Sequence, residues 1–225
     1  MRLTAAQRLS MCRRDLRVLW RHCRFGSAYF TSAGRASRTA ALVRLYRVVN
    51  AHLAGLGIDY WINFGTLLGW HRTGAILAHD RDVDFSAPVA AFERIWASRH
   101  TLPPGFRLFD TSFRHPGPKL YFCHQGWEAD VYFYAEEQGR LHALLSSPYP
   151  SDTASFPREW VYPLQPVMLH EAATFAPAQP EAWLRHTYGY LGPDAVRDRA
   201  TGYFRPRRAT VPDPDSPAHE PCRSR

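Results

Sequence analysis

The chain has 225 residues and a formal net charge of +8, with 45% hydrophobic and 21% charged side chains. These values are typical of one globular domain, or one domain with tails, that is long enough to bury a core of its own. Four widely spaced cysteines without a CxxC pair exclude a zinc ribbon or finger and a dense disulfide scaffold. No apolar run is long enough to span a membrane, and the first residues lack the apolar core of a secretory signal. We therefore expect a cytoplasmic protein with reduced thiols.

The positive charge is concentrated at the two ends of the chain. Residues 1–25 contain seven arginines and one acidic residue, and residues 197–225 contain seven arginines and four acidic residues. The segment between them carries a net charge of −1. A nucleic-acid groove would place its basic residues on the folded body, so the distribution favours basic arms that touch an anionic surface.

The N-terminal part of the chain predicts two helices. Residues 1–24 carry apolar residues at helical spacing with arginines between them. This helix has two interpretations: a basic amphipathic helix on an anionic membrane, or a terminal helix docked on the body with its arginines in water. Residues 26–34 are small and polar and predict a linker. A second helix is expected over residues 37–56, where Gly55 and Gly57 end it. Its apolar stripe comprises Leu42, Leu45, Tyr46, Val49 and Leu53.

The rest of the chain alternates short strand-like and helix-like segments. Strands are expected at residues 60–64, 82–85, 120–123 and 129–134. Helices are expected at residues 88–97 and 180–188, and another opens from a tight turn at residues 65–69. A long loop is expected at residues 146–166, and a disordered tail at residues 205–225. This mixture indicates an α/β or α+β fold.

Three carboxylates recur at every second position in Asp80, Asp82 and Asp84. On an extended chain they share one face, where they repel one another unless cations lie between them. Oxygen ligands of this kind favour Mg²⁺ or Mn²⁺. The alternative is a solvated turn. A fourth acid, Asp130, lies within a run of apolar β-forming residues, where a buried and unpaired carboxylate would be costly.

Several residues are candidates for phosphate contacts. Gly65 and Thr66 form a turn before a helix, which offers backbone N–H groups to an anion. Arg72 either contacts phosphate or packs against the acidic cluster. Lys119 is the only lysine of the chain, and is either a phosphate contact or a chance surface residue. A phosphate-binding turn followed by two acids on one strand and a third on a later strand is the arrangement of the nucleotidyltransferase superfamily.

The same residues give a more specific match. The segment from Gly65 to Gly69, then Arg72, then His79 to Asp84 resembles the signature of the LicD/fukutin family. Glu128 to Phe133 resembles the second acidic strand of that family, and Phe175 to Gly189 resembles its C-terminal segment. The resemblance covers roughly residues 40–190. It implies a nucleotidyltransferase-like mixed sheet flanked by helices.

The expected organisation follows from the resemblance and the charge distribution together. Residues 1–35 form a basic helix and linker, residues 36–196 a LicD/fukutin-like nucleotidyltransferase domain, and residues 197–225 a basic, proline-rich tail that we expect to be disordered.

The resemblance implies a metal-dependent transferase. Known members of the family move a phosphate-linked group, phosphocholine or ribitol phosphate, from a CDP-activated donor to a sugar or glycan hydroxyl, as in cell-surface polysaccharides and glycoproteins. By resemblance, Asp80, Asp82 and Asp84 bind Mg²⁺ or Mn²⁺, with Asp82 and Asp84 essential for catalysis. Asp130 is the base that activates the acceptor, or a further ligand. A lipid-linked acceptor would give the N-terminal helix a reason to contact the inner membrane face.

Three other functions stay open at this point. A different member of the superfamily would transfer a nucleotidyl group to a small molecule or protein. A nucleic-acid-binding module would use the arginine-rich ends, which the charge distribution disfavours. A scaffold without activity would keep the fold alone, and the intact set of acids argues against it.

Overall fold

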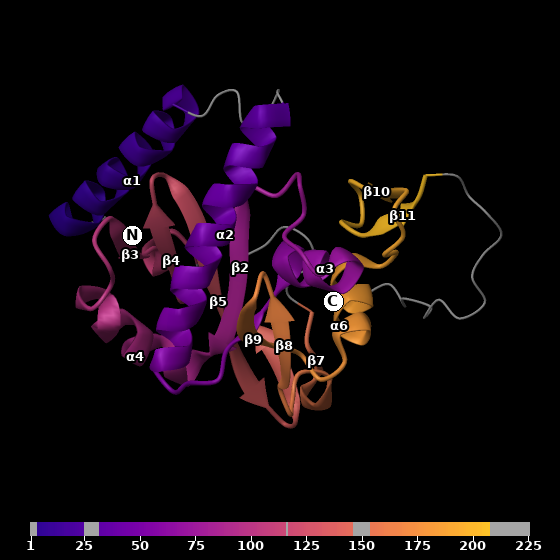
Figure 1. Ribbon diagram of the computed structural model, residues 1–225. Helices are drawn as coiled ribbons and strands as arrows, with labels where there is room; N and C mark the ends of the chain where they lie inside the picture. The colour runs from indigo at the N-terminus through magenta and orange to yellow at the C-terminus, as the bar shows by residue number, and fades with distance from the viewer. Residues whose placement is uncertain (1–3, 25–31, 116, 146–153, 208–225) are drawn as a thin grey trace.

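The computed structural model describes residues 4–24, 32–115, 117–145 and 154–207, which form a mixed sheet with helices on both faces (Figure 1). This architecture confirms the expected mixed α/β class. The main path of the sheet runs in the order β1 (Trp61–Ile62), β2 (Asp82–Pro88), β5 (Trp127–Glu137), β4 (Lys119–His124) and β3 (Phe106–Asp110). The far end of the long strand β5 pairs with β6 (Arg140–Ala143), and β6 pairs with β7 (Phe156–Pro157).

The pairing of β2 with β5 positions the acidic residues. These two strands run parallel, and the other pairs in the sheet are antiparallel. Their register places Asp82 opposite Glu128 and Asp84 opposite Asp130. Because side chains alternate along a strand, these four carboxylates lie on one face of the sheet.

The opposite face of the sheet forms the core against helix α2 (Ser32–Gly55), which crosses in front of β2 and β5 in Figure 1. All five residues of the predicted apolar stripe are buried, which confirms that prediction. Tyr46 stacks on Phe85 of β2 with 5.9 Å between ring centroids. The helix begins at Ser32, earlier than expected, and residues 25–31 of the predicted linker lie outside the described residues.

Two short helices and an aromatic cluster cover the acidic face at the β1 end of the sheet. Helix α3 (Phe64–Thr73) begins directly after β1, and α6 (Pro180–Tyr188) packs beside it. The Phe64 ring meets Tyr132 of β5 edge-on at 4.9 Å. The Trp183 ring lies 6.4 Å from that of Phe64.

Helix α1 (Ala5–Arg24) lies over the acidic face at the other end, near β3 and β4. Its guanidinium groups form the contacts: Arg14 lies over the Tyr121 ring and Arg17 over the Phe109 ring. The helix is docked on the body, as one of the two interpretations expected, and Arg8 and Arg13 are exposed, but Arg14 and Arg17 do not lie in water as expected. These two arginines face the body, whereas the apolar residues Leu9, Leu16, Leu19 and Trp20 are exposed.

The remaining elements connect and extend this body. Helix α4 (Phe92–Ala97) lies between the 3-10 turns η2 (Val89–Ala91) and η3 (Ser98–His100), close to the helix expected at residues 88–97. Further 3-10 turns are η4 (Ser112–Arg114) and η5 (Arg158–Trp160). Two separate hairpins follow, β8 (Gln165–Leu169) with β9 (Ala172–Ala176), and β10 (Ala195–Arg197) with β11 (Phe204–Pro206).

Several expectations need correction. The described part of the predicted loop at residues 146–166 contains β7, η5 and the start of β8, while residues 146–153 lie outside the described residues. The hairpin of β10 and β11 enters the segment predicted as a tail, and residues 208–225 lie outside the described residues. Strands β3, β6, β8 and β9 were not expected.

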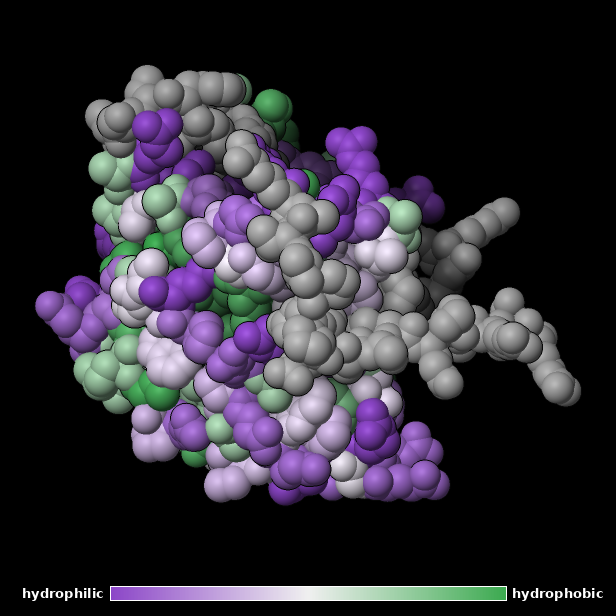
Figure 2. All heavy atoms as spheres, turned by 90° about the vertical axis from the view of Figure 1, so that its right-hand side faces the viewer, coloured by the Kyte–Doolittle hydropathy of each residue, from purple (hydrophilic) through white to green (hydrophobic). Residues whose placement is uncertain are grey.

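On the face of the molecule that carries α6 and the β10–β11 hairpin, apolar and polar residues are mixed (Figure 2). Figure 2 shows hydrophobic residues scattered among hydrophilic ones on this face. Among the described helices, none is both long enough and apolar enough to cross a bilayer.

Candidate active site

The junction between β1 and α3 is fastened to Asp84. The Asn63 backbone N–H donates to the Asp84 carbonyl oxygen at 3.0 Å, and the Gly65 N–H donates to Asp84 Oδ2 at 3.2 Å. In return, the Asp84 N–H donates to Thr66 Oγ1 at 2.8 Å. Phe64 takes a φ of 42°, a left-handed conformation that a bulky residue rarely adopts. The strained turn therefore directs the start of α3 at the Asp84 carboxylate.

The two glycines of the GTLLG segment are explained by close approaches. A Cβ atom at Gly65 would lie 3.4 Å from both carboxylate oxygens of Asp80 and 3.5 Å from Asp84 Oδ2. A Cβ atom at Gly69 would collide with the carbonyl oxygen of Ala75. Gly65 thus leaves room for the carboxylates of Asp80 and Asp84. Gly69 lets the loop that leads to Asp80 pass close to α3.

Three carboxylates converge on this face. Asp82, Asp84 and Asp130 each offer an oxygen that lies within 4.8 Å of the others. Asp84 is 7% exposed, whereas Asp82 lies at the rim and is exposed as a whole residue. The predicted metal set was Asp80, Asp82 and Asp84, with Asp130 as the base or a further ligand. The parallel pairing of β2 with β5 brings Asp130 beside Asp82 and Asp84, while Asp80 lies outside this group of three.

The electrostatics of this cluster favour a bound cation. Burial, together with the charges of Asp82 and Asp130, raises the pKa of Asp84 well above its usual range. Although Asp82 is exposed as a whole residue, its carboxyl group is desolvated among its neighbours, and this burial and the charge of Asp130 raise its pKa to about 6. A divalent ion among the oxygens would remove this repulsion, and hard carboxylate oxygens suit Mg²⁺ or Mn²⁺.

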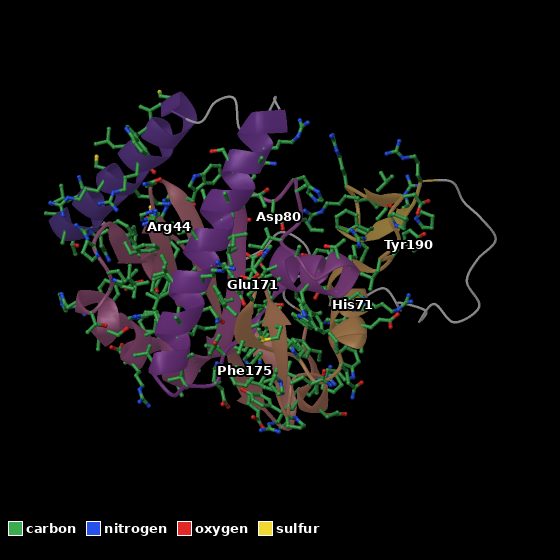
Figure 3. All side chains as sticks on the ribbon, in the orientation of Figure 1. Arg44, His71, Asp80, Glu171, Phe175 and Tyr190 are labelled. Atoms are coloured by element: carbon green, nitrogen blue, oxygen red, sulfur yellow. The ribbon has the colours of Figure 1, made fainter. Side chains whose placement is uncertain are left out.

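Asp80 lies beside the cluster, in the loop between α3 and β2 (Figure 3). Its Oδ2 atom is buried and has no hydrogen-bond donor among the described residues, and burial raises its pKa. The loop is held by Arg38 of α2, which donates to the Ala78 carbonyl oxygen at 2.5 Å. A buried carboxylate oxygen without a donor is a further feature that fits a cation nearby.

Asp130 is held by two donors on the same face. The Lys119 ammonium group lies 3.1 Å from Asp130 Oδ2, and the Tyr132 hydroxyl donates to the same oxygen at 3.0 Å. Burial and the charge of Asp130 raise the pKa of Tyr132 well above its usual range, so the hydroxyl keeps its proton. The only lysine of the chain is therefore a member of the site.

A pocket of about 390 Å³ opens beside Asp130. Its lining combines one acid with several cationic side chains: Arg14, Thr111, Arg114, His115, Lys119, Tyr121 and Asp130. A larger hollow of about 790 Å³ runs along α2, where it is lined mainly by alanine, valine and arginine. The smaller pocket is the better candidate for the active site because it contains a carboxylate of the cluster.

Three of the four predicted phosphate contacts, Gly65, Thr66 and Arg72, are engaged within the protein in this structure. The Thr66 hydroxyl is fully buried and accepts the Asp84 N–H, which leaves it inaccessible to a ligand. Arg72 donates to the carbonyl oxygens of Leu191 and Gly192, so it holds the C-terminal segment and does not pack against the acidic cluster. The Gly65 N–H is occupied by Asp84.

Residues that the sequence did not reveal complete the site. Tyr132 was detectable in principle, since it lies two positions after Asp130 on the same strand face. Arg14 reaches Glu128 at 3.2 Å across a sequence separation of 114 residues, which no local pattern predicts. Asn63 is fully buried, donates to the Ser86 hydroxyl at 2.7 Å and accepts from the Trp183 indole at 2.6 Å.

Comparison with protein families gives one match. The model described as "LicD/FKTN/FKRP, nucleotidyltransferase domain" matches residues 57–179, which is more than half of the 225-residue chain. The matched segment includes the site residues Asp80, Asp82, Asp84, Asp130, Lys119 and Tyr132. A search of curated proteins found no match.

Proposed function

Because the chain belongs to the LicD/FKTN/FKRP family, and is therefore a transferase in general terms, we propose that it moves a phosphate-linked group from a CDP-activated donor to a sugar or glycan hydroxyl. The observation that carries the proposal is the convergence of Asp82, Asp84 and Asp130 on two parallel strands within the matched segment. Phosphocholine and ribitol phosphate are the head groups that the family suggests.

The three carboxylates supply the metal site in this proposal. Asp82, Asp84 and Asp130 hold Mg²⁺ or Mn²⁺, which when bound neutralises the charge that a diphosphate carries and develops during phosphoryl transfer. Asp80 contributes its buried carboxylate from the neighbouring loop. Gly65 donates its N–H to Asp84 and so fixes the orientation of that ligand.

Asp130 is assigned as a ligand and not as the base. Its Oδ2 atom already accepts from Lys119 and Tyr132, and its carboxylate stands with those of Asp82 and Asp84. Both donors fix the carboxylate in one orientation, as the partners of a metal ligand do. Of the predicted phosphate contacts, Lys119 is the one whose side chain faces the pocket, where its ammonium group can also meet a phosphate.

The proposal is tested with the purified protein, Mg²⁺ and a panel of CDP-linked donors in the presence of sugar acceptors. The expected result is release of CMP with one donor, and its loss in the Asp84→Asn variant, whose metal-free form melts at the same temperature as the metal-free wild type or at a higher one. A labelled nucleoside triphosphate that gives pyrophosphate and a nucleotide-labelled product would overturn the proposal in favour of nucleotidyl transfer. Absence of turnover with every donor would also count against it.

A further inference from the structure

The pocket beside Asp130 is lined by three side chains that keep a positive charge at neutral pH. Arg14, Arg114 and Lys119 come from three separate elements: α1, η4 and the start of β4. Three cations around one opening repel one another unless anions compensate them. Within the protein, Arg14 pairs with Glu128 and Lys119 with Asp130, while Arg114 has no carboxylate partner among the described residues.

Arg14 is held in place from two sides. Its Nε donates to Glu128 Oε1 at 3.2 Å, and its guanidinium carbon lies 5.3 Å from the centroid of the Tyr121 ring. Its Nη2 also donates to Glu128 Oε2 at 3.5 Å, and its Nη1 lies 3.8 Å from the Asp15 carboxylate. Arginine presents five N–H donors in a planar fork, so the remaining N–H groups of Nη1 and Nη2 can still bind a ligand. The side chain is 29% exposed, which leaves it open towards the pocket.

The loop that carries Arg114 is closed by its own hydrogen bonds. The Thr111 N–H donates to the Lys119 carbonyl oxygen at 2.9 Å, and the Lys119 N–H donates to Ser112 Oγ at 3.1 Å. This closure brings the base of η4 against the first residue of β4. Arg114 and Lys119 are therefore presented to one pocket by a tied loop.

We propose that Arg14, Arg114 and Lys119 form a binding site for a phosphate or diphosphate group, next to the three carboxylates of the metal cluster. The inference names the part of the site that would hold the donor, and in this respect it rests on the proposed function. It also gives α1 a role: Arg14 lies outside the matched segment of residues 57–179, so the helix adds a substrate contact that the family domain does not contain.

The site is tested by the binding of inorganic pyrophosphate in the presence of Mg²⁺, measured by calorimetry. Charge-assisted contacts of this kind predict that Arg14→Ala and Arg114→Ala each weaken binding about 10- to 100-fold. Arg13→Ala is the matched control, since Arg13 lies on the same helix, is exposed and does not line the pocket. Equal affinities in the Arg14→Ala and Arg13→Ala variants would overturn the proposal.

Glu128→Gln separates a ligand contact from a structural one. The substitution breaks the ion pair with Arg14 but keeps the cation and removes a negative charge near the pocket, so pyrophosphate binding should stay equal or become tighter. Weaker pyrophosphate binding in Glu128→Gln would mean that Arg14 affects binding only through its ion pair with Glu128, and would overturn its role as a phosphate contact. Pyrophosphate binding is measured without turnover, so its result is independent of the donor assay. The phosphate site can be confirmed when no CDP-linked donor reacts, and it can be overturned when a donor does react.

The outward face of α1 carries a second, independent inference. Four large apolar side chains stand exposed on it: Leu9 (53%), Leu16 (64%), Leu19 (58%) and Trp20 (43%). At 100° per residue these positions lie on one stripe, and Cys12 and Cys23 on the same stripe are exposed too. Arg14 and Arg17 occupy the inward side, and Leu9, Leu16 and Leu19 are exposed on the outward side.

We infer that this stripe docks on an anionic phospholipid surface. Charge complementarity selects this occupant, because exposed arginines such as Arg8 and Arg13 flank the stripe, while only Arg14 and Arg17 are seen to face the body. Basic residues near such a surface are attracted to its anionic head groups, and Leu and Trp insert at the interface. A second copy of the chain would bring two segments of the same charge together, which disfavours self-association.

Sedimentation with vesicles of phosphatidylcholine, with and without about a third phosphatidylserine, tests this inference. The full chain should bind the anionic vesicles and lose binding in high salt. Leu16→Asn with Leu19→Asn should lower binding at least tenfold, whereas Met168→Asn, which alters an equally exposed apolar residue of β8, should not. Unchanged binding in the double variant would overturn the inference, as would a dimer of the wild-type chain that the double substitution dissociates.

Discussion

The backbone N–H of Asp84 and the hydroxyl of Thr66 form a hydrogen bond of 2.8 Å inside the protein. This bond ties β2 to the first turn of α3, and the Gly65 N–H closes the connection by donating to the carboxylate of the same aspartate. The glycine–threonine pair therefore orients the Asp84 carboxylate, which we propose as a metal ligand. Its place in the family signature is explained by the geometry of Asp84.

Thr66→Val should destabilise the protein. The substitution keeps the shape of the side chain but leaves the buried Asp84 N–H without an acceptor, which costs about 1–3 kcal/mol. Denaturant unfolding of the metal-free protein measures this loss. Thr66→Ser, which keeps the hydroxyl, is the matched control and should lose less. Equal stability of Thr66→Val and the wild type would show that the hydrogen bond contributes nothing.

Metal binding should depend on Asp84. In the wild type, Mg²⁺ or Mn²⁺ should raise the melting temperature, because an ion that binds only the folded state stabilises it. Asp84→Asn should abolish that increase and reduce turnover to below a tenth of the wild type. The metal-free variant should melt at the same or a higher temperature, since the substitution removes like-charge repulsion. Asp59→Asn, which alters an exposed aspartate just before β1, should leave both readouts unchanged.

The stability of the metal-free protein should fall as pH rises through the acidic range. The pKa of Asp82 is raised from 3.8 to about 6 by burial and by the charges of Asp130, Asp80 and Glu128, so the folded state binds its proton more tightly than the unfolded state. Between about pH 4 and pH 6 the folded protein thus holds more protons, and the free energy of unfolding decreases as they are released.

The comparison with Asp82→Asn isolates this contribution, because buried histidines titrate equally in both proteins. Urea unfolding at a series of pH values should give a smaller decline for the variant than for the wild type. Saturating Mg²⁺ should reverse the trend in the wild type, since the ion requires ionised ligands. Identical pH dependence of the two metal-free proteins would contradict the raised pKa.

The sequence predicted the parts of the fold that depend on local pattern. The stripe of α2, the alternation at Asp82 to Phe85 and the proline at the start of α6 each reflect a periodicity or an end signal. The hairpin of β8 and β9 was not predicted because its turn is formed by His170 and Glu171, whose φ values are 47° and 62°. Such a turn usually contains asparagine and glycine.

Strand β6 was detectable, since it follows a turn at Gln138 and Gly139 with φ values of 52° and 73°. The membership of Asp130 in the cluster depends on the parallel register of β2 with β5, and the contact of Arg14 with Glu128 depends on tertiary structure alone. Sequence spacing along one strand contains neither kind of information. The sequence therefore located the two strands that carry these aspartates, but it did not identify the residues that other elements bring next to them.

Replacement of Asp130 by asparagine separates the two roles that the sequence left open. A base that only accepts the acceptor proton would leave Mg²⁺ binding intact in Asp130→Asn and cut the rate by about 10²–10⁴-fold. A metal ligand would lose Mg²⁺ affinity together with turnover. We expect the second outcome, because the carboxylate lies with Asp82 and Asp84 and its Oδ2 atom is engaged by Lys119 and Tyr132.

Tyr132→Phe provides a second test of the role of Asp130. It removes one donor to Asp130 but keeps the ring that packs against Phe64, so the fold should survive. If Asp130 is a ligand, loss of its orienting hydroxyl should weaken Mg²⁺ binding about 10- to 100-fold, the usual range for a partner that orients a metal ligand. If Asp130 is a base, the same variant should change the pH profile of the rate at unchanged Mg²⁺ affinity. Calorimetric Mg²⁺ titration of both variants therefore decides the role of Asp130, and unaltered Mg²⁺ affinity in both would overturn its assignment as a ligand.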